Sequence, residues 1–414
     1  MDLVSAARLQ TQLDAQLAGT DACVMVNGSA GTVASRSPAR PLAPASTVKL
    51  LTATAALATL GADFKYETSA VAAAPPGGGT VDRLWLVGAG DPGLATPDYD
   101  AFLQSEPGTR GDATTSMAAL ADAIVAQGVK RVTGGVQGSD ARYEQLRYLP
   151  GWKPDYRTDG EVGPLGALTV NAGLTEFQGK KTPADDPAVY AAAELTRLLI
   201  ERGVAVDGLP GHSDPPPNAT KIASATSPPL ADIIGAMLRS SQNLTAELLV
   251  REIGAHASNQ GTTAAGTRAI AAKLAALGLP TEGLVMLDGS GLARDDRATC
   301  ALLLGALHLG ARHEFAALRT GLPVAGESGT LAPSFVGTPL QGKLRAKTGS
   351  LDGVTGLVGL LDLRTPLEFS LLANGLFPEV AGIGLRQLVA LTISGYPDGP
   401  PAQTLVPVPA PSRS

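Results

Sequence analysis

Residues 44–49 read Pro-Ala-Ser-Thr-Val-Lys and open an apolar run that continues to Leu57. Pro44 and Ser46 are typical of the start of a helix, so we expect a buried helix to begin here. Side chains three residues apart share one helix face, which brings the Ser46 hydroxyl within hydrogen-bond reach of the Lys49 amine. The stretch therefore predicts a serine nucleophile beside a possible base.

Two tripeptides far along the chain strengthen this interpretation, because a Ser-x-x-Lys pair alone is common on helices. The three motifs, in this order, are typical of class A β-lactamases and penicillin-binding proteins. The two later motifs are Ser241-Gln242-Asn243 and Lys347-Thr348-Gly349.

Length and composition limit the possible classes of function. The 414 residues suit two to three domains, and 44% of them are hydrophobic;. A net charge of −6 and the lack of a long Lys/Arg block argue against a nucleic-acid partner;. The four histidines have neither HExxH spacing nor cysteine partners, so we expect no metal site and no cofactor;.

Cys23 and Cys300 leave two alternatives open, one disulfide or two unlinked thiols;. The first twenty residues suggest an amphipathic helix without the basic start and apolar centre of a signal peptide;. A leader removed before this numbering begins is a further open alternative. No segment is long and apolar enough to predict a transmembrane helix.

The order of predicted elements indicates an α+β fold, an α/β sandwich whose catalytic domain is discontinuous in sequence. Strands are expected from both ends of the chain, and Ala/Leu-rich helices from its start and third quarter. We assign residues 1–60 and 218–395 to the catalytic domain. A smaller mixed α/β domain, residues 61–217, is inserted after the nucleophile helix and ends at a Pro-rich linker. The Pro-rich tail, residues 396–414, is predicted to be disordered.

The motif residues suggest separate roles in acyl transfer. Lys49 can remove the Ser46 proton only when it is neutral, and both burial and the nearby Lys347 favour that form. Ser241 can pass a proton to the leaving amine, while Asn243 can hold a lysine and a substrate amide. The alternative for the second motif is a simple helix cap.

The third motif is expected to end a strand beside the substrate. Lys347 and Thr348 can hold a terminal carboxylate, and Gly349 lets a substrate backbone lie close. The N–H groups of Ser46 and Ser350 are candidate oxyanion donors. The alternative is an edge strand with a glycine bend.

A Ser-His-Asp triad is the main competing mechanism. Residues 326–329, Gly-Glu-Ser-Gly, approach a nucleophile-elbow motif, but Thr330 replaces its final glycine;. No histidine has an obvious matching role.

Taken together, the sequence resembles the penicillin-binding protein 4 type of D-alanyl-D-alanine carboxypeptidases, also called class C low-molecular-mass enzymes or peptidase family S13. The resemblance covers most of the chain. It depends on residues 44–49, Gly90-Asp91-Pro92, Ser241-Gln242-Asn243, Asp288-Gly289-Ser290-Gly291-Leu292 and residues 345–350.

The resemblance implies a β-lactamase/transpeptidase-like domain with an insertion after the nucleophile helix. It implies an exported enzyme of the cell envelope, periplasmic or secreted, that removes the terminal D-alanine of peptidoglycan stem peptides and can cut D,D-crosslinks. It also implies acylation, and hence inhibition, by β-lactam antibiotics.

By the same resemblance Ser46 is the nucleophile and Lys49 the base. The remaining family positions are Ser241 and Asn243 in the second motif and Lys347, Thr348 and Gly349 in the third. Tyr143 and Trp152 resemble an insert segment near the side-chain pocket. Gln242 departs from the family, which often has Asp there, and this leaves the preferred substrate open. A β-lactamase and a catalytically silent wall-binding module remain the alternative functions.

Overall fold

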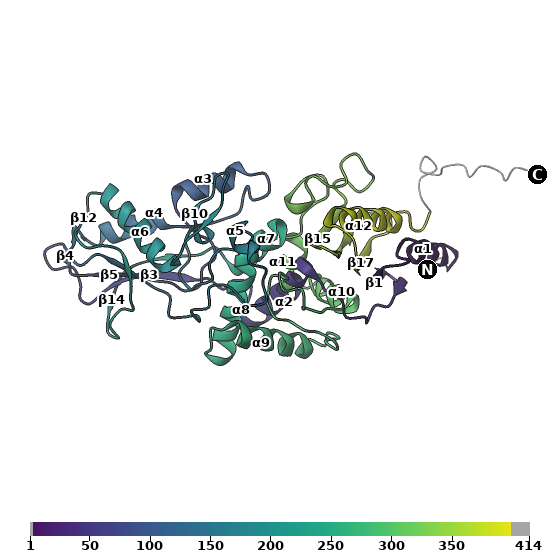
Figure 1. The fold of residues 1–414 in the computed structure, drawn as a ribbon, viewed down its shortest axis with the longest axis horizontal. Coiled ribbons are helices and arrows are strands. Elements are labelled where there is room, and N and C mark those ends of the chain that lie inside the picture. Colours follow the sequence, from purple (N-terminus) through teal and green to yellow (C-terminus); the bar gives the residue numbers. More distant parts are fainter. Residues whose placement is uncertain (1–2, 399–414) are drawn as a thin grey trace, which may run out of the picture.

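The computed structural model describes residues 3–398, which form a main domain and an insert domain side by side along an elongated molecule (Figure 1). The main domain is built on a five-stranded antiparallel sheet with the order β15-β16-β17-β1-β2. Its strands therefore come from both ends of the chain, as predicted. They are β1 (Asp21–Gly28), β2 (Gly31–Arg36), β15 (Leu344–Leu351), β16 (Val354–Leu361) and β17 (Leu367–Asn374).

Helices cover both faces of the main sheet. Because side chains alternate along a strand, Val358 and Leu372 pack against one helical layer, while Leu357 and Leu371 pack against the other;. The second layer consists of α1 (Leu3–Gln16) and α12 (Glu379–Ser394). The first contains α2 (Lys49–Leu60), α7 (Leu230–Ser240), α8 (Asn243–Ser258), α9 (Thr263–Ala276), α10 (Cys300–Leu309) and α11 (Ala317–Thr320).

The insert domain has its own sheet and its own hydrophobic core. Its five strands follow the order β13-β9-β5-β3-β14, with α4 and α6 beside them (Figure 1). Apolar side chains of both helices form one core with those of the sheet. The elements are β3 (Glu67–Ala72), β5 (Leu84–Val87), β9 (Val136–Ser139), β13 (Gly211–His212), β14 (Thr220–Thr226), α4 (Met117–Ala126) and α6 (Pro187–Glu201).

The predicted end of the insertion at residue 217 is too early. Strand β14 pairs with β3 from Thr220↔Ala72 to Thr226↔Glu67, so the insert domain extends to Thr226. The Pro-rich residues 215–217 form part of the connection between two strands of one sheet, not a linker between domains. Proline is excluded from central strands but suits such a connection, which is why composition alone misplaced the boundary.

Several short elements complete the chain. They are the strands β4 (Thr80–Val81), β6 (Leu94–Ala95), β7 (Thr115–Ser116), β8 (Arg131–Val132), β10 (Leu174–Glu176), β11 (Thr182–Pro183) and β12 (Ala205–Val206), with the helices α3 (Pro97–Ser105) and α5 (Asp155–Thr158) and the 3-10 turns η1 (Ala45–Val48), η2 (Asn171–Gly173), η3 (His313–Phe315) and η4 (Gly329–Leu331). Most of the predicted tail, residues 399–414, lies outside the described residues.

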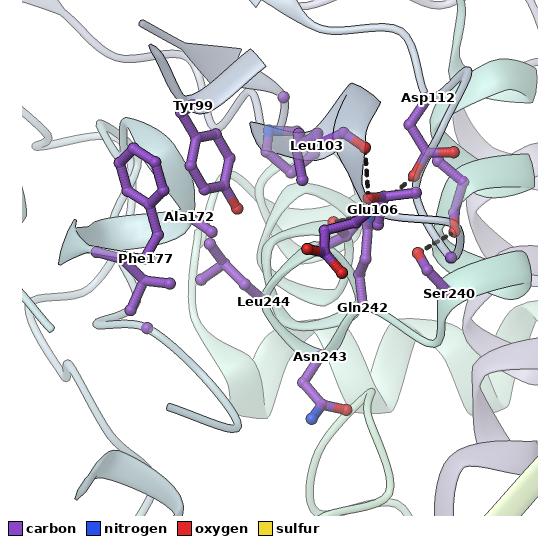
Figure 2. A pocket seen from close by; sticks show the side chains of 18 of the residues that line it. Tyr99, Leu103, Glu106, Asp112, Ala172, Phe177, Ser240, Gln242, Asn243 and Leu244 are labelled. Carbon is purple, nitrogen blue, oxygen red and sulfur yellow. Dashed lines mark hydrogen bonds between the residues drawn. The ribbon is translucent and has the colours of Figure 1, made fainter. Parts of the chain in front are cut away.

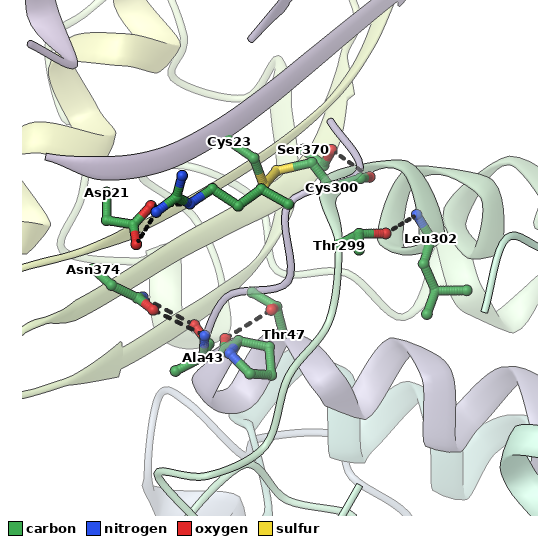
Figure 3. Close-up of a disulfide and its surroundings, with 11 residues drawn as sticks. Asp21, Cys23, Ala43, Thr47, Thr299, Cys300, Leu302, Ser370 and Asn374 are labelled. Atoms are coloured by element: carbon green, nitrogen blue, oxygen red, sulfur yellow. Dashed lines mark hydrogen bonds and ion pairs between the residues drawn. A yellow bond between two sulfur atoms is a disulfide. The ribbon is translucent and has the colours of Figure 1, made fainter. Parts of the chain in front are cut away.

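Cys23 and Cys300 form a disulfide, with their Cα atoms 5.9 Å apart (Figure 3). Cys23 lies on β1 and Cys300 begins α10, and both are fully buried. Ser370 Oγ on β17 donates a hydrogen bond to the Cys300 carbonyl oxygen at 2.7 Å. The bridge therefore ties the sheet to the helical layer that contains α2, and it resolves the pairing that the sequence left open.

Residues 140–170 connect the two domains by packing on the main domain. Tyr143 and Trp152 are buried in a cluster with Leu244 and Leu248 of α8. Between residues 3 and 398, no helix combines the length and apolar character needed to cross a bilayer. Within the same residues, no group of three or more His, Cys, Asp or Glu side chains is arranged to hold a metal ion.

Candidate active site

Ser46 lies on η1, a 3-10 turn that leads directly into α2. The predicted helix is therefore present, but its first turn is tighter than an α-helix. Ala45 has a φ of 46°, a left-handed conformation that is uncommon for a residue with a side chain;. Outliers of this kind persist only where the surroundings hold them, and they concentrate at functional sites.

Two glycines from distant segments press against this turn. A Cβ on Gly291 would lie 2.0 Å from the Ala45 carbonyl oxygen, and one on Gly349 would lie 2.7 Å from the Pro44 carbonyl oxygen. Neither position has room for a side chain. The missing side chain of Gly349 therefore makes room for the turn that carries Ser46.

Lys49, the first residue of α2, is fully buried with its amine next to Ser46. Its Nζ lies 2.9 Å from Ser46 Oγ, 2.7 Å from Asn243 Oδ1 and 2.6 Å from the Ser290 carbonyl oxygen. Asn243 Oδ1 and the Ser290 carbonyl oxygen accept hydrogen bonds from the Lys49 amine, and these two contacts hold its nitrogen beside Ser46 Oγ. This is the geometry that nucleophile activation requires.

The surroundings of Lys49 set its protonation. Burial lowers the pKa of the amine from 10.5 to about 7, although the carboxyl groups of Asp288, Glu247 and Glu161 act in the opposite direction;. An amine with this pKa is partly neutral at physiological pH. Proton transfer is most efficient when the pKa of the base lies near the working pH.

The loop that supplies the Ser290 carbonyl is held by two buried carboxyl groups. Glu247 Oε1 accepts the N–H groups of Gly289 and Ser290 at 3.0 and 2.8 Å. Asp288 accepts two N–H groups of the same loop and, at 2.8 Å, the indole N–H of Trp152. These contacts fix the carbonyl that orients Lys49, and they give Trp152 a structural function behind the site.

The second motif lies between α7 and α8. Ser241 adopts φ 60° and ψ 38°, which ends α7 and turns the serine toward the third motif. Lys347 Nζ lies 2.9 Å from Ser241 Oγ. Asn243 begins α8, and its Nδ2 donates to the Glu161 carbonyl oxygen at 2.8 Å, which directs its Oδ1 to Lys49.

Gln242, the middle residue of the motif, faces the insert domain. Its Nε2 donates to Asp112 Oδ2 at 3.1 Å, and its Oε1 accepts from Thr245 Oγ1 at 2.8 Å. Asp112 also pairs with Arg239 of α7. The insert domain therefore contributes a buried carboxyl group beside the middle residue of the second motif.

The third motif lies on β15, at the edge of the main sheet. Lys347 is fully buried, and burial followed by the charges of Lys49 and Arg386 lowers its pKa well below the usual 10.5. Thr348 Oγ1 lies 3.0 Å from Thr330 Oγ1. Arg386 of α12 donates to the Gly349 carbonyl oxygen at 3.1 Å and to Ser350 Oγ at 2.7 Å.

These groups surround a cavity of about 540 Å³, which we call the catalytic cleft. The second and third motifs line one side of the cleft, and residues 153–161 line the other. Five predicted residues line it directly, and the two lysines reach it through the hydroxyls they contact. The five are Ser46, Ser241, Asn243, Thr348 and Ser350.

The competing triad has no support in the geometry. Ser328 Oγ accepts the Val324 N–H at 3.0 Å and so closes a local turn. His212 contacts Asp140 and Asp186, which belong to the insert domain and its connection. His308 is exposed and pairs with Glu368 on the far end of the sheet. No histidine among the described residues lines the catalytic cleft.

Sequence reasoning missed three participants. Arg386 and Thr330 contact the predicted residues but lie outside the motifs quoted above, and the Ser290 carbonyl belongs to a quoted motif that had been given no role in the site. For Ser290 the signal was the run Asp-Gly-Ser-Gly at 288–291, which supported the family resemblance. A main-chain carbonyl leaves no trace in a side-chain pattern, so its contribution required the structure.

Comparison with known proteins gives consistent results. The model of the D-Ala-D-Ala carboxypeptidase 3 (S13) family matches residues 6–184 and 179–393. A D-alanyl-D-alanine carboxypeptidase of an Actinomadura species is 29% identical, covering 87% of this chain and 78% of that protein. A carboxypeptidase of Mycobacterium tuberculosis is 32% identical, covering 82% of this chain and 72% of that protein.

Among solved structures, penicillin binding protein 4 of Haemophilus influenzae superposes with a TM-score of 0.76. The match covers 96% of this chain and all of the other, at 20% identity. At that level of identity the likeness concerns the fold. It confirms the predicted discontinuous α+β architecture.

Proposed function

The chain belongs to the D-Ala-D-Ala carboxypeptidase 3 (S13) family, and from this membership we propose that Ser46 is the residue acylated by substrate. The protein is a serine D-alanyl-D-alanine carboxypeptidase, the activity for which its family and relatives are named. The observation that supports the residue assignment is the 2.9 Å contact between Lys49 Nζ and Ser46 Oγ, in a fully buried amine with a lowered pKa.

In the first step neutral Lys49 accepts the hydroxyl proton of Ser46 as Oγ attacks the carbonyl carbon of the penultimate D-alanine. A bond forms between Ser46 Oγ and this carbon, and negative charge develops on the carbonyl oxygen. The N–H groups of Ser46 and Ser350 are the proposed donors to that oxygen, since fixed donors in a desolvated site stabilise developing charge most effectively.

In the second step the C–N bond breaks and the terminal D-alanine leaves. Its amine needs one proton, which Ser241 Oγ can deliver because Lys347 lies 2.9 Å behind it;. Its carboxylate is proposed to bind Lys347 and Thr348, which Thr330 helps to orient;. Water then hydrolyses the ester by the reverse proton route, releasing the shortened peptide.

The substrate is proposed to be the peptidoglycan stem peptide, and β-lactams are proposed to acylate Ser46 in its place. This assignment puts the working protein outside the cytoplasm, in the cell envelope or the surrounding medium. The buried Cys23–Cys300 disulfide supports that location, because such bridges persist in oxidising compartments;.

The decisive experiment is labelling with a fluorescent penicillin, followed by mass spectrometry of the labelled peptide. We expect a long-lived adduct on Ser46 and, with a pentapeptide substrate, release of one D-alanine. Rapid loss of the label would indicate a β-lactamase, and no label would indicate a silent wall-binding module.

Two serine variants serve as a matched pair. Ser46→Ala is expected to abolish both label and D-alanine release, because no other residue carries the attacking oxygen. Ser328→Ala removes the serine of the Gly-Glu-Ser-Gly segment and is expected to keep both activities. Full labelling of Ser46→Ala would overturn the assignment.

A further inference from the structure

A second cavity of about 490 Å³ adjoins the catalytic cleft and extends under helix α3 of the insert domain. We call it the α3 pocket. Glu161, Ser240, Asn243 and Thr330 line both cavities, so the two spaces are adjacent. Nothing in the carboxypeptidase mechanism above uses this second space.

The walls of the α3 pocket are mainly apolar at the end distant from Ser46. The Tyr99 and Phe177 rings meet edge to face with centroids 4.9 Å apart, and the Phe102 ring lies 5.3 Å from Phe177. Leu103 and Leu244 continue this surface toward the cleft (Figure 2). These rings and side chains form an apolar wall that faces an open space.

Helix α3 is unusual in how little of it the protein covers. None of its nine residues is fully buried, although Tyr99, Phe102 and Leu103 are large and apolar. A helix normally stabilises itself by burying such a face against the core. Here the face is left half-buried along the pocket, where a ligand with apolar groups would cover it.

The end nearer the cleft is polar and rigid. Asp112 is 5% exposed and pairs with Arg239 and Gln242, so the insert domain is fastened to the second motif at the rim of the pocket. In Figure 2, Asp112, Gln242 and Ser240 lie at this end, and Tyr99 and Phe177 lie at the other. A ligand would therefore run from the polar rim to the aromatic wall.

The position of the pocket relative to Ser46 indicates which part of a substrate it can meet. Thr330 contacts Thr348, the proposed carboxylate-binding residue, and it is Thr330 that leads into the α3 pocket. Leu351 and Asp352, which follow Ser350 along the chain, line only the catalytic cleft. The pocket thus opens on the side of the departing group.

We propose that the α3 pocket receives the aliphatic arm of a second stem peptide when the substrate is a D,D-crosslink. This inference builds on the proposed function. In a crosslink the amine that leaves is not free alanine but the side-chain amine of another peptide, which continues away from the scissile bond as a methylene chain. Apolar walls suit such a chain, and free D-alanine is too short to reach them.

The chemistry is the same acyl transfer. The Ser46 ester bond forms, the amide C–N bond of the crosslink breaks, and the leaving amine takes the proton by way of Ser241. Water then hydrolyses the ester, which yields one carboxylate and one free amine. The pocket adds binding energy only when the leaving group carries the arm, so it separates endopeptidase from carboxypeptidase action.

The test compares two substrates on pocket variants. Ala113→Trp fills the pocket from an exposed lining position, and Leu103→Asp places a charge on its apolar wall. We expect kcat/KM for a purified D,D-crosslinked muropeptide dimer to fall about tenfold or more in each variant. D-Alanine release from a monomeric pentapeptide and acylation by benzylpenicillin should change less than about twofold.

Ala126→Trp is the matched control, an exposed alanine of the insert domain that lines neither cavity. The inference is overturned if dimer cleavage is unaffected in both pocket variants, or if dimer and monomer activities fall together. It is also overturned if the wild-type protein cleaves no dimer. In each of these cases penicillin labelling of Ser46 would still report on the proposed function separately.

Discussion

Two fully buried lysines lie in one site, and their surroundings differ. Lys49 lies among Asp288, Glu247 and Glu161, whose carboxyl groups oppose the effect of burial and leave its pKa at about 7. Lys347 instead faces Lys49 and Arg386, which lower its pKa further below the usual value. In the described structure, residues 3–398, Lys347 makes no ion pair with a carboxylate.

The difference shows that the protein itself surrounds Lys49 with carboxyl groups, whereas a counter-charge for Lys347 has to come from a ligand. Carboxyl groups from the main domain (Asp288, Glu247) and from the insertion (Glu161) surround Lys49, so that amine can lose and regain a proton in every cycle. Lys347 lacks such a partner, and a substrate carboxylate would provide it. Binding of the carboxylate would therefore favour the charged form of Lys347 and, through repulsion, the neutral form of Lys49.

The strongest way to break this comparison is Lys49→Arg. A guanidinium stays protonated and cannot accept the Ser46 proton, so we expect the rate of penicillin acylation to fall by about 10²–10⁴-fold. The measurement is the labelling rate with fluorescent penicillin, beside a thermal melt that checks folding. Lys130→Arg, at an exposed insert-domain position, is the control. Acylation at the wild-type rate would remove Lys49 from the function of base.

Lys347→Ala tests the other half of the comparison, the proposed binding of the substrate carboxylate by Lys347. We expect kcat/KM for a D-alanyl-D-alanine peptide to fall by about 10–100-fold, since a hydrogen bond to a charged group is lost. For the same peptide with a C-terminal amide, the loss should be much smaller. Kinetics with the two peptides on wild type and variant give the answer. An equal loss for both would mean that Lys347 does not recognise the carboxylate.

The pH dependence of acylation sharpens the assignment of the base. The lowered pKa means that the amine of Lys49 becomes neutral as pH rises through about 7, and only the neutral form accepts a proton;. We expect the acylation rate to fall about tenfold from pH 8 to pH 6. Stopped-flow labelling across this range measures it. A rate that is flat, or that increases toward acid, would contradict the prediction.

The smallest effect on catalysis is expected from the double variant Cys23→Ala, Cys300→Ala. Its disulfide joins β1 to the start of α10, and neither cysteine lines the catalytic cleft, so labelling of Ser46 should be unchanged at room temperature. The free energy of unfolding should decrease by about 2–5 kcal/mol. Denaturant unfolding provides the measurement. An unfolding midpoint identical to that of the wild type would show that the bridge does not contribute to stability.

The convergence of the proposed catalytic residues could be predicted because their chemistry depends on side chains at fixed spacing. Ser46 and Lys49 share a helical turn, and the two other motifs converge on them as expected. The strands of the main sheet were also accessible, since the short and mainly apolar runs of β16 and β17 are a local property of the sequence;.

Other features depend on contacts that no local pattern encodes. The Ser290 carbonyl and Arg386 act through tertiary packing, and Gly349 is required by the approach of the nucleophile turn. The end of the insertion was misplaced because β14 pairs with β3, about 150 residues earlier in the chain;. The α3 pocket left no signal, because a half-buried apolar helix has the same pattern as a buried one.

The turn that carries Ser46 is confined between Gly291 and Gly349, which come from segments some 245 and 303 residues further along the chain. A nascent or misassembled molecule lacks one or both of these walls, so its serine has no defined orientation. With Ser46 as the proposed site of acylation, penicillin labelling is expected to count finished molecules and to ignore folding intermediates. For this protein, the amount of bound penicillin is expected to measure the yield of correctly folded molecules, and the measurement can be made in a crude extract without purification.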